Sequence, residues 1–318
     1  MVGLIILILV PVVIYHFLFS APGGGIGMER IVVNLDTSEQ ELIPKLKEQG
    51  YIRNQLAFNF VLKVKGWQGR IKPGSYMVSK NMDAWILADN LVRFSYEKWV
   101  VVPEGLRKEE VAEIIQEKLG WSDEIKEEFL GASREGYIFP DTYLLRIANF
   151  DDAGKAAAQR MESQFNEKTA DLFKEAEKYR IRNDTLIVLA SLVQREAGNK
   201  TDMPLIAGVI WNRWLNNMRF EIDATVQYAL GEPGNWWKNV SLQDYKVDSP
   251  YNTYLYKGRP PAPICNPGLA AISAVINSEE NGYFYYLHDS EGQIHLAETY
   301  EEHLANIQKY LRGSSNEE

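Results

Sequence analysis

The segment that most constrains this chain is NDTLIVLASLVQREAGN, which begins at Asn183 and carries an apolar run across its middle. Such a run, bracketed by polar residues, is typical of a helix that is buried on most sides. Asn183, Asp184 and Thr185 offer side chains that can cap its first turn, and Gly198 stands where a left-handed residue would end it. The chain must fold a core around this helix, and its 318 residues suffice for about two domains.

One acidic residue, Glu196, closes the predicted helix. It follows Leu189, Leu192 and Val193 by seven, four and three positions, so its carboxyl group ends an apolar stripe on one helix face. A carboxyl group held against apolar side chains resists ionisation, which makes it a candidate proton donor near neutral pH. A glutamate in a last helical turn is otherwise an ordinary solvated residue, so spacing alone leaves both interpretations open.

Further polar residues lie in the apolar segments that follow Glu196. They are Asn212 and Arg213 in a second helical run, and Asp223, Thr225 and Tyr228 in the segment after it. Polar groups embedded in apolar runs need partners, and converging ones often line a cleft. This neighbourhood favours the catalytic interpretation of Glu196.

Charge and missing motifs exclude several functions. The formal net charge of -9 argues against nucleic-acid binding, because phosphate contacts need a basic surface. The single cysteine, Cys265, permits neither an internal disulfide nor a cysteine metal cluster. The three C-terminal histidines lack zinc-hydrolase spacing and no nucleotide fingerprint occurs, so no metal or other cofactor is expected. Of these, His295 and His303 are expected to hydrogen-bond across a hairpin and a helix.

Several short motifs occur in one order between about Val100 and Leu311. They are VVPEG, EGYIFPDTYLL, LASLVQREAGN, AGVIWNRW, MRFEIDATVQYALG, YNTYLYKGRPPAPICNPG and HLAETYEEHLANI. Together they resemble the endolytic murein transglycosylases, the MltG or YceG-like family. The sequence departs from that pattern at Ala224, where proline often follows the aspartate, and at Leu304, where asparagine often follows the histidine. Neither departure removes Glu196.

The resemblance implies a lytic transglycosylase, a carbon–oxygen lyase that cleaves the β-1,4 bond between N-acetylmuramic acid and N-acetylglucosamine. Glu196 would act as acid and then as base, leaving 1,6-anhydro ends and terminating nascent glycan strands. The residues expected to orient the sugars are Arg213, Asn212, Asp223, Thr225, Tyr251, Asn252, Tyr254, Asn266 and Glu135. The implied partners are peptidoglycan strands and penicillin-binding proteins.

Two alternatives to this activity remain open at the level of sequence. A muramidase that uses water would pair Glu196 with Glu221 or Asp223 as the base. A membrane-anchored adaptor of the cell-wall synthases would bind peptidoglycan without needing Glu196. The role of the Trp236-Trp237 pair is also open, because the two rings could stack on sugars as a subsite or could serve as ordinary packing.

The expected fold class is α+β, with a membrane anchor, a small LysM-like α/β module and a larger mixed α/β catalytic domain. The apolar run Val2–Phe19 is long enough, at about 27 Å as a helix, to span a bilayer. Its length and the lack of a preceding basic residue favour an anchor over a cleaved signal peptide. The expected boundaries are 1–20 for the anchor, 21–28 for a tether, 29–97 for the LysM-like subdomain, 98–312 for the catalytic domain and 313–318 for a disordered tail.

The resemblance also implies a location at the bacterial cytoplasmic membrane as a single-pass protein, with the catalytic domain outside the cytoplasm. The LysM-like subdomain would align glycan, or serve only as a spacer. Strands are expected at 29–35, near 74–78 and at 98–102, with a hairpin of 283–288 and 293–296. Helices are expected at 39–49, from 54, and at 84–92, 107–119, 153–179, 269–276 and 300–311.

Overall fold

The computed structural model describes residues 2–25, 27–147 and 152–312, and the chain divides into two compact units. The first unit comprises Met1–Val101, Ile115–Ser122 and Thr142–Ala153. The second comprises Val102–Ile114, Asp123–Asp141 and Gly154–Glu318. The chain therefore passes between the units several times, whereas the sequence suggests one boundary at residues 97 and 98.

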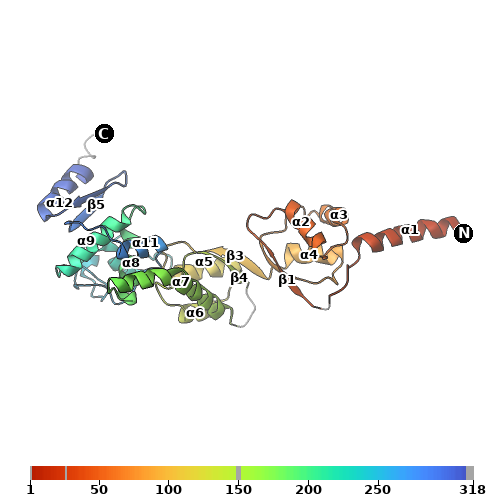
Figure 1. Cartoon of the computed structure of the whole chain (residues 1–318), viewed down its shortest axis with the longest axis horizontal. Helices are drawn as coiled ribbons and strands as arrows, with labels where there is room; N and C mark the ends of the chain where they lie inside the picture. Colours follow the sequence, from red (N-terminus) through yellow and green to blue (C-terminus); the bar gives the residue numbers. More distant parts are fainter. Residues whose placement is uncertain (1, 26, 148–151, 313–318) are drawn as a thin grey trace. The chain divides into compact units, whose positions relative to one another are not determined.

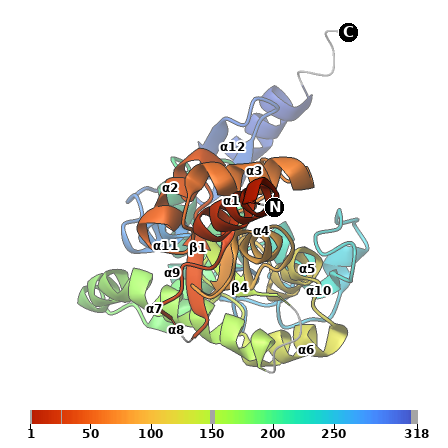
Figure 2. The ribbon, with the colours of Figure 1, turned by 90° about the vertical axis from the view of Figure 1, so that its right-hand side faces the viewer.

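The first unit is built on an antiparallel sheet with the strand order β1-β2-β3-β4. Its strands are β1 (Glu29–Val33), β2 (Gly74–Val78), β3 (Glu97–Val101) and β4 (Thr142–Arg146). Its helices are α1 (Val2–Phe19), α2 (Glu39–Glu48), α3 (Gln55–Lys65) and α4 (Ala84–Arg93), and α5 (Lys108–Leu119) is shared with the second unit. In Figure 1 and Figure 2 alike, α2, α3 and α4 lie together, and Phe58, Leu62 and Leu87 are fully buried in their core.

Local signals account for the helix starts in this unit. Ser38 and Glu41 form a capping box at the start of α2, while Asn54 and Asp83 accept backbone N–H bonds at the starts of α3 and α4. The predicted elements between residues 29 and 97 are confirmed. The strand β4 was not expected, because Tyr143, Leu144 and Leu145 follow a proline turn that gives no pairing signal. The LysM-like character of the module stays a prediction.

The predicted anchor over residues 1–20 is not confirmed. Among the residues that the structure describes, no helix combines the length and the hydropathy needed to cross a bilayer.

The second unit is mainly helical and holds α8 (Asn183–Glu196) at its centre. The other helices are α6 (Asp123–Ala132), α7 (Ala153–Lys178), α9 (Met203–Leu215), α10 (Asp223–Leu230), α11 (Leu269–Ile276) and α12 (Tyr300–Asn306). A short 3-10 helix covers Asp244–Lys246, and a π-helical turn covers Ile307–Arg312. The hairpin of β5 (Tyr285–His288) and β6 (Ile294–Ala297) adds the only β-structure with a paired ladder among the described residues of this unit.

The central position of α8 follows from its sequence. Every residue from Thr185 to Val193 is buried, and the helix contacts α9, α10 and α11. The α+β class is thereby confirmed, as are the predicted long helix α7, the helix α11 and the β5–β6 hairpin. The helix α6 was not expected, because only Phe129 of its ten residues is buried and its apolar pattern is weak. The predicted disordered tail, 313–318, lies outside the described residues.

Both predicted end signals of α8 are wrong. The helix starts after Arg182, which provides no side-chain cap. Asp184 is the second residue inside the helix, and its carboxylate binds Arg182 at 3.1 Å and Arg259 at 2.9 Å. At the other end, Ala197 takes an extended conformation (φ -76°, ψ 127°), and Gly198 is not left-handed. The chain leaves the helix in extended form, so no left-handed residue is needed.

Candidate active site

Glu196 occupies the last turn of α8, where the buried helix reaches the surface of the second unit. Its side chain is partly buried, and its Oε2 accepts a 2.7 Å hydrogen bond from the hydroxyl of Tyr286 on β5. Removal from water raises the pKa of the Glu196 carboxyl, and the nearby Asp223 carboxylate raises it further. The Tyr286 hydrogen bond, Arg195 and Arg213 act in the opposite direction without cancelling the rise. The predicted environment of a protonated acid is thus present.

A cleft of about 450 Å³ opens over this carboxyl group. Its walls come from α8, α9, α10, the 220–223 and 254 loops, the hairpin and α12. The lining residues are Glu196, Arg213, Phe220, Glu221, Asp223, Tyr254, Tyr285, Tyr286, Tyr300 and His303. Of the ten site residues expected from the sequence, the structure therefore brings Glu196, Arg213, Asp223 and Tyr254 together.

Arg213 lies in the cleft wall but is mostly committed to backbone. Its Nη1 donates to the carbonyl of Phe220 at 2.5 Å and its Nε to the carbonyl of Phe284 at 2.6 Å, and the side chain is 9% exposed. Glu221 lies 3.5 Å from Nη1 on the solvent side. Arg213 therefore fixes the 220 loop and the base of the hairpin, and brings positive charge to the cleft.

Asn212 does not line the cleft. Its Nδ2 donates to the carbonyls of Asn281 and Tyr283, both at 2.9 Å, in the segment that leads into β5. Together with the Arg213 bond to Phe284, these bonds hold the segment before β5 at three residues against the end of α9. The two residues expected to touch substrate thus position the strand that carries Tyr286.

Asp223 is the first residue of α10 and is exposed at the cleft. Its Oδ1 accepts hydrogen bonds from Tyr254 at 2.5 Å and from Tyr245 at 3.1 Å, and the two rings pack with centroids 4.3 Å apart. The acidic side chain at the helix N-terminus is favoured by the helix dipole. The arrangement offers a carboxylate with two aromatic rings beside Glu196.

Two other expected residues, Thr225 and Asn252, are buried and support the segment that carries Tyr245 and Tyr254. Thr225 donates to the carbonyl of Ile222 at 2.6 Å and shares a 3.0 Å hydrogen bond with Thr253. Asn252 donates to the carbonyls of Tyr245 and Val247 and accepts from the backbone N–H of Tyr254. Both Thr225 and Asn252 are 0% exposed, and they fold the segment that presents Tyr254.

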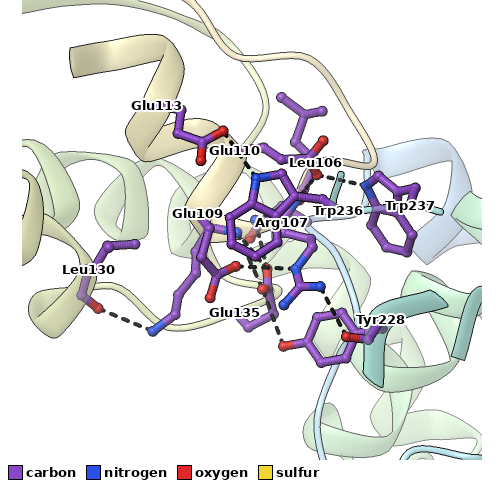
Figure 3. A network of polar contacts seen from close by, with 12 residues as sticks. Leu106, Arg107, Glu109, Glu110, Glu113, Leu130, Glu135, Tyr228, Trp236 and Trp237 are labelled. Carbon is purple, nitrogen blue, oxygen red and sulfur yellow. Dashed lines mark hydrogen bonds and ion pairs between the residues drawn. The ribbon is translucent and has the colours of Figure 1, made fainter. Parts of the chain in front are cut away.

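Glu135, Tyr251 and Asn266 belong to a separate group, the Glu135 cluster, which also contains Arg107 and Tyr228. Figure 3 shows Glu135, Arg107 and Tyr228 of this cluster. The Glu135 carboxylate accepts from Asn266 Nδ2 at 3.0 Å, from the backbone N–H of Lys108 at 3.2 Å and from Tyr228 at 3.5 Å. Tyr251 packs on Tyr228 with ring centroids 4.8 Å apart. Burial, followed by the Glu109 charge, raises the pKa of Glu135 to about 8.

The Trp236-Trp237 pair fastens its loop to α5. The two indole N–H groups donate to Glu113 at 3.0 Å and to Glu110 at 2.8 Å (Figure 3). Arg195, the residue before Glu196, lies 3.8 Å from the Trp237 ring centre and reaches the carbonyl of Gly105, while Gln194 accepts from the backbone N–H of Gly268. These contacts account for the tryptophans as packing residues.

Three tyrosines of the cleft, Tyr285, Tyr286 and Tyr300, were not predicted from the sequence, and His303 was expected to have only a structural role. His303 lines the cleft and stacks on Tyr285, whereas His295 hydrogen-bonds Asp289 at 2.7 Å across the hairpin turn, as expected. The alternation of side chains along the predicted strand was the one sequence signal for Tyr286. It shows that neighbouring side chains point to opposite faces, but not which face points toward Glu196. In the described part of the chain, no group of three or more His, Cys, Asp or Glu side chains is arranged to hold a metal ion.

The sequence model of the YceG-like family matches residues 31–309. An endolytic murein transglycosylase of Bacillus subtilis (strain 168) is 30% identical over 302 residues, covering 86% of this chain and 81% of that protein. An endolytic murein transglycosylase of Streptococcus pneumoniae serotype 2 is 26% identical, and the match covers 87% of this chain but 57% of that protein. A crystal structure of a yceG-like protein from Listeria monocytogenes shares the fold, with a TM-score of 0.60 at 24% identity over 88% of this chain and 98% of that one.

Proposed function

The chain belongs to the YceG-like family, and from that premise we propose that it is an endolytic murein transglycosylase acting on peptidoglycan glycan strands. The observation that carries the proposal is the partly buried Glu196 carboxyl at the cleft, whose pKa is raised by removal from water. A carboxyl that keeps its proton near neutral pH suits protonation of a glycosidic oxygen.

In the first step, Glu196 donates its proton to the oxygen that links N-acetylmuramic acid to the following N-acetylglucosamine. The bond from C1 of the muramic residue to that oxygen breaks, and C1 takes on oxocarbenium character. The N-acetylglucosamine end leaves with a free hydroxyl group. The positive charge that develops at C1 is favoured by Asp223, whose exposed carboxylate lines the same cleft.

In the second step, ionised Glu196 accepts the proton of the muramic C6 hydroxyl while that oxygen attacks C1. The new C1–O6 bond closes a 1,6-anhydro ring, and Glu196 regains the proton it gave away. One carboxyl group serves both steps because the nucleophile comes from the substrate itself. No water is consumed and no cofactor takes part.

The cleft also supplies groups for binding the sugars. Tyr254, Tyr285 and Tyr300 present aromatic faces and hydroxyls at its wall, which suit the apolar faces and hydroxyl groups of pyranose rings. Arg213 contributes positive charge near Glu221 at the opposite side. Asn212, Thr225, Asn252 and the Glu135 cluster act behind this lining, by holding the loops that carry it.

A muramidase that uses water is the second candidate, and the exposed carboxylates of Glu221 and Asp223 in the same cleft favour it. Either could activate a water molecule while Glu196 acts as the acid. The products differ: a hydrolase leaves a reducing end, whereas the transglycosylase leaves an anhydro end that is lighter by one water. With this substrate, we also propose that the second unit acts outside the cytoplasm, beside the synthases that extend nascent strands.

The experiment compares the parent with Glu196→Gln on uncrosslinked glycan strands, with products identified by mass spectrometry. The parent should release 1,6-anhydro ends, and the variant should be slower by about 10²–10⁴-fold. Glu127→Gln, an exposed change on α6, serves as the control and should match the parent. Digestion by Glu196→Gln at the parental rate would refute the assignment, and reducing ends from the parent would select the muramidase.

A further inference from the structure

Tyr286 makes the one hydrogen bond to the Glu196 carboxyl among the described residues. Its hydroxyl donates to Oε2 at 2.7 Å, and its ring packs against the core of the second unit. Oε2 and Oε1 are therefore not equivalent. Oε2 accepts a hydrogen bond from the Tyr286 hydroxyl, and in a carboxylic acid the carbonyl oxygen is the better acceptor, so this contact favours the acidic proton on Oε1.

Building on the proposed function, we infer that Tyr286 is a positioning residue that keeps the acidic proton of Glu196 on Oε1, the oxygen left for substrate. When that proton has moved to the glycosidic oxygen, the same hydroxyl stabilises the carboxylate until it accepts the C6 proton. Hydrogen bonds to a charged acceptor are stronger than those to a neutral one, so the bond tightens as the reaction proceeds. A phenylalanine in this place would pack equally well but would do neither.

The strand that carries Tyr286 is held firmly enough for this role. Asn212 donates to the carbonyl of Tyr283, and Arg213 donates to the carbonyl of Phe284. These two residues directly precede β5. Within the hairpin, Tyr286 pairs with Leu296 in the antiparallel register. The phenol thus reaches Glu196 from a strand fixed on two sides, which is what precise placement of a proton requires.

Other charged or titratable groups also face Glu196. Asp223 on α10 raises the pKa of its carboxyl, whereas Arg195 on α8 and Arg213 on α9 lower it. Glu221, Tyr254 and His303 line the same cleft. After burial itself, the Tyr286 hydrogen bond is the largest influence on this pKa, and it favours the ionised form. Removing the phenolic hydroxyl should therefore raise the pKa of Glu196.

The test measures the pH dependence of glycan cleavage for the parent and Tyr286→Phe. Activity that needs protonated Glu196 falls as the pH rises through the pKa of that group, which gives the alkaline limb of the profile. In Tyr286→Phe this limb should move up by about one pH unit, and the maximal rate should fall about tenfold. Tyr256→Phe is the matched control, because Tyr256 is exposed and donates to Asp248 at 2.6 Å outside the cleft lining. Its profile should coincide with that of the parent.

A second replacement guards against a variant that folds poorly. Fluorotyrosine at position 286 retains the ring and the hydrogen bond but makes the phenol a stronger donor, so the alkaline limb should move to lower pH. Opposite shifts for the two replacements support the inference. An unmoved limb in both, with Glu196→Gln inactive in the same assay, overturns it while leaving the proposed function intact. A fully active Glu196→Gln overturns both, because no acid would remain for Tyr286 to orient.

Discussion

Replacement of Glu135 by glutamine tests the Glu135 cluster through the pH dependence of stability. The pKa of this carboxyl is raised from 4.5 to about 8 in the folded protein, first by burial and then by the charge of Glu109. Below pH 4.5 the group is protonated in both the folded and the unfolded chain, so it adds no pH dependence to the free energy of unfolding. Between the two values the unfolded chain releases the proton while the folded chain keeps it, so the free energy of unfolding falls as the pH rises.

The size of the effect follows from that interval. A span of about 3.5 pH units, at 1.36 kcal/mol per unit, corresponds to at most roughly 5 kcal/mol lost between pH 4.5 and pH 8. Local rearrangement around the newly ionised group reduces the measured loss, so about 2–4 kcal/mol is expected. Glutamine resembles the neutral acid in shape and can still accept hydrogen bonds from Asn266 and from the Lys108 backbone. Because its amide does not titrate, the contribution of this position no longer depends on pH.

The assay is unfolding by urea at pH 5, 7 and 9, with the difference between Glu135→Gln and parent taken at each pH so that other titrating groups cancel. The variant should gain stability relative to the parent from pH 5 to pH 9. Glu127→Gln, on the exposed face of α6, should show a constant difference. A constant difference for Glu135→Gln as well would mean that the carboxyl is already ionised at pH 5, and the interpretation of the cluster would be wrong.

Two further changes test the packing around the site. Gly136→Ala should lower the free energy of unfolding by about 2–4 kcal/mol, because Gly136 has φ +84° and a Cβ there would lie 2.5 Å from the Pro263 side chain. The control Gly292→Ala, at φ +77° in open space, should lower it by only about 1 kcal/mol in the same urea titration. Arg213→Met should cost about 3 kcal/mol and lower glycan cleavage, since it removes the buried donors to Phe220 and Phe284; unchanged melting and activity would show that the hairpin does not depend on it.

The sequence was informative where the signal is local. The apolar stripe of α8 predicted both the burial of the helix and the place of Glu196 at its end, because helical periodicity links residues three and four positions apart. The helices α2, α3 and α4 were predicted near their observed positions for the same reason. The ends of α8 were not, since the helix begins one residue before Asp184, whose carboxylate binds Arg259 from 75 positions away in the chain.

Sequence could not separate polar residues that face a ligand from those that bind backbone. Asn252 and Asn266 stand in loops and Thr225 in α10, all in segments rich in polar and aromatic residues, which suggested a binding surface. All three are fully buried, and their side chains hydrogen-bond within the protein. Tyr286 escaped notice for the converse reason. It lies among several tyrosines, and only the folded structure, which brings together residues 90 positions apart, shows that it is the partner of Glu196.

That separation of 90 positions also bears on how the protein is made. On the ribosome, α8 emerges with its glutamate well before the hairpin has been synthesised, so for part of translation the acid lacks its tyrosine and one wall of its trough. The proposed cleavage therefore requires β5 and α12 to be in place, and a chain interrupted before them would lack Tyr286 and part of the cleft lining.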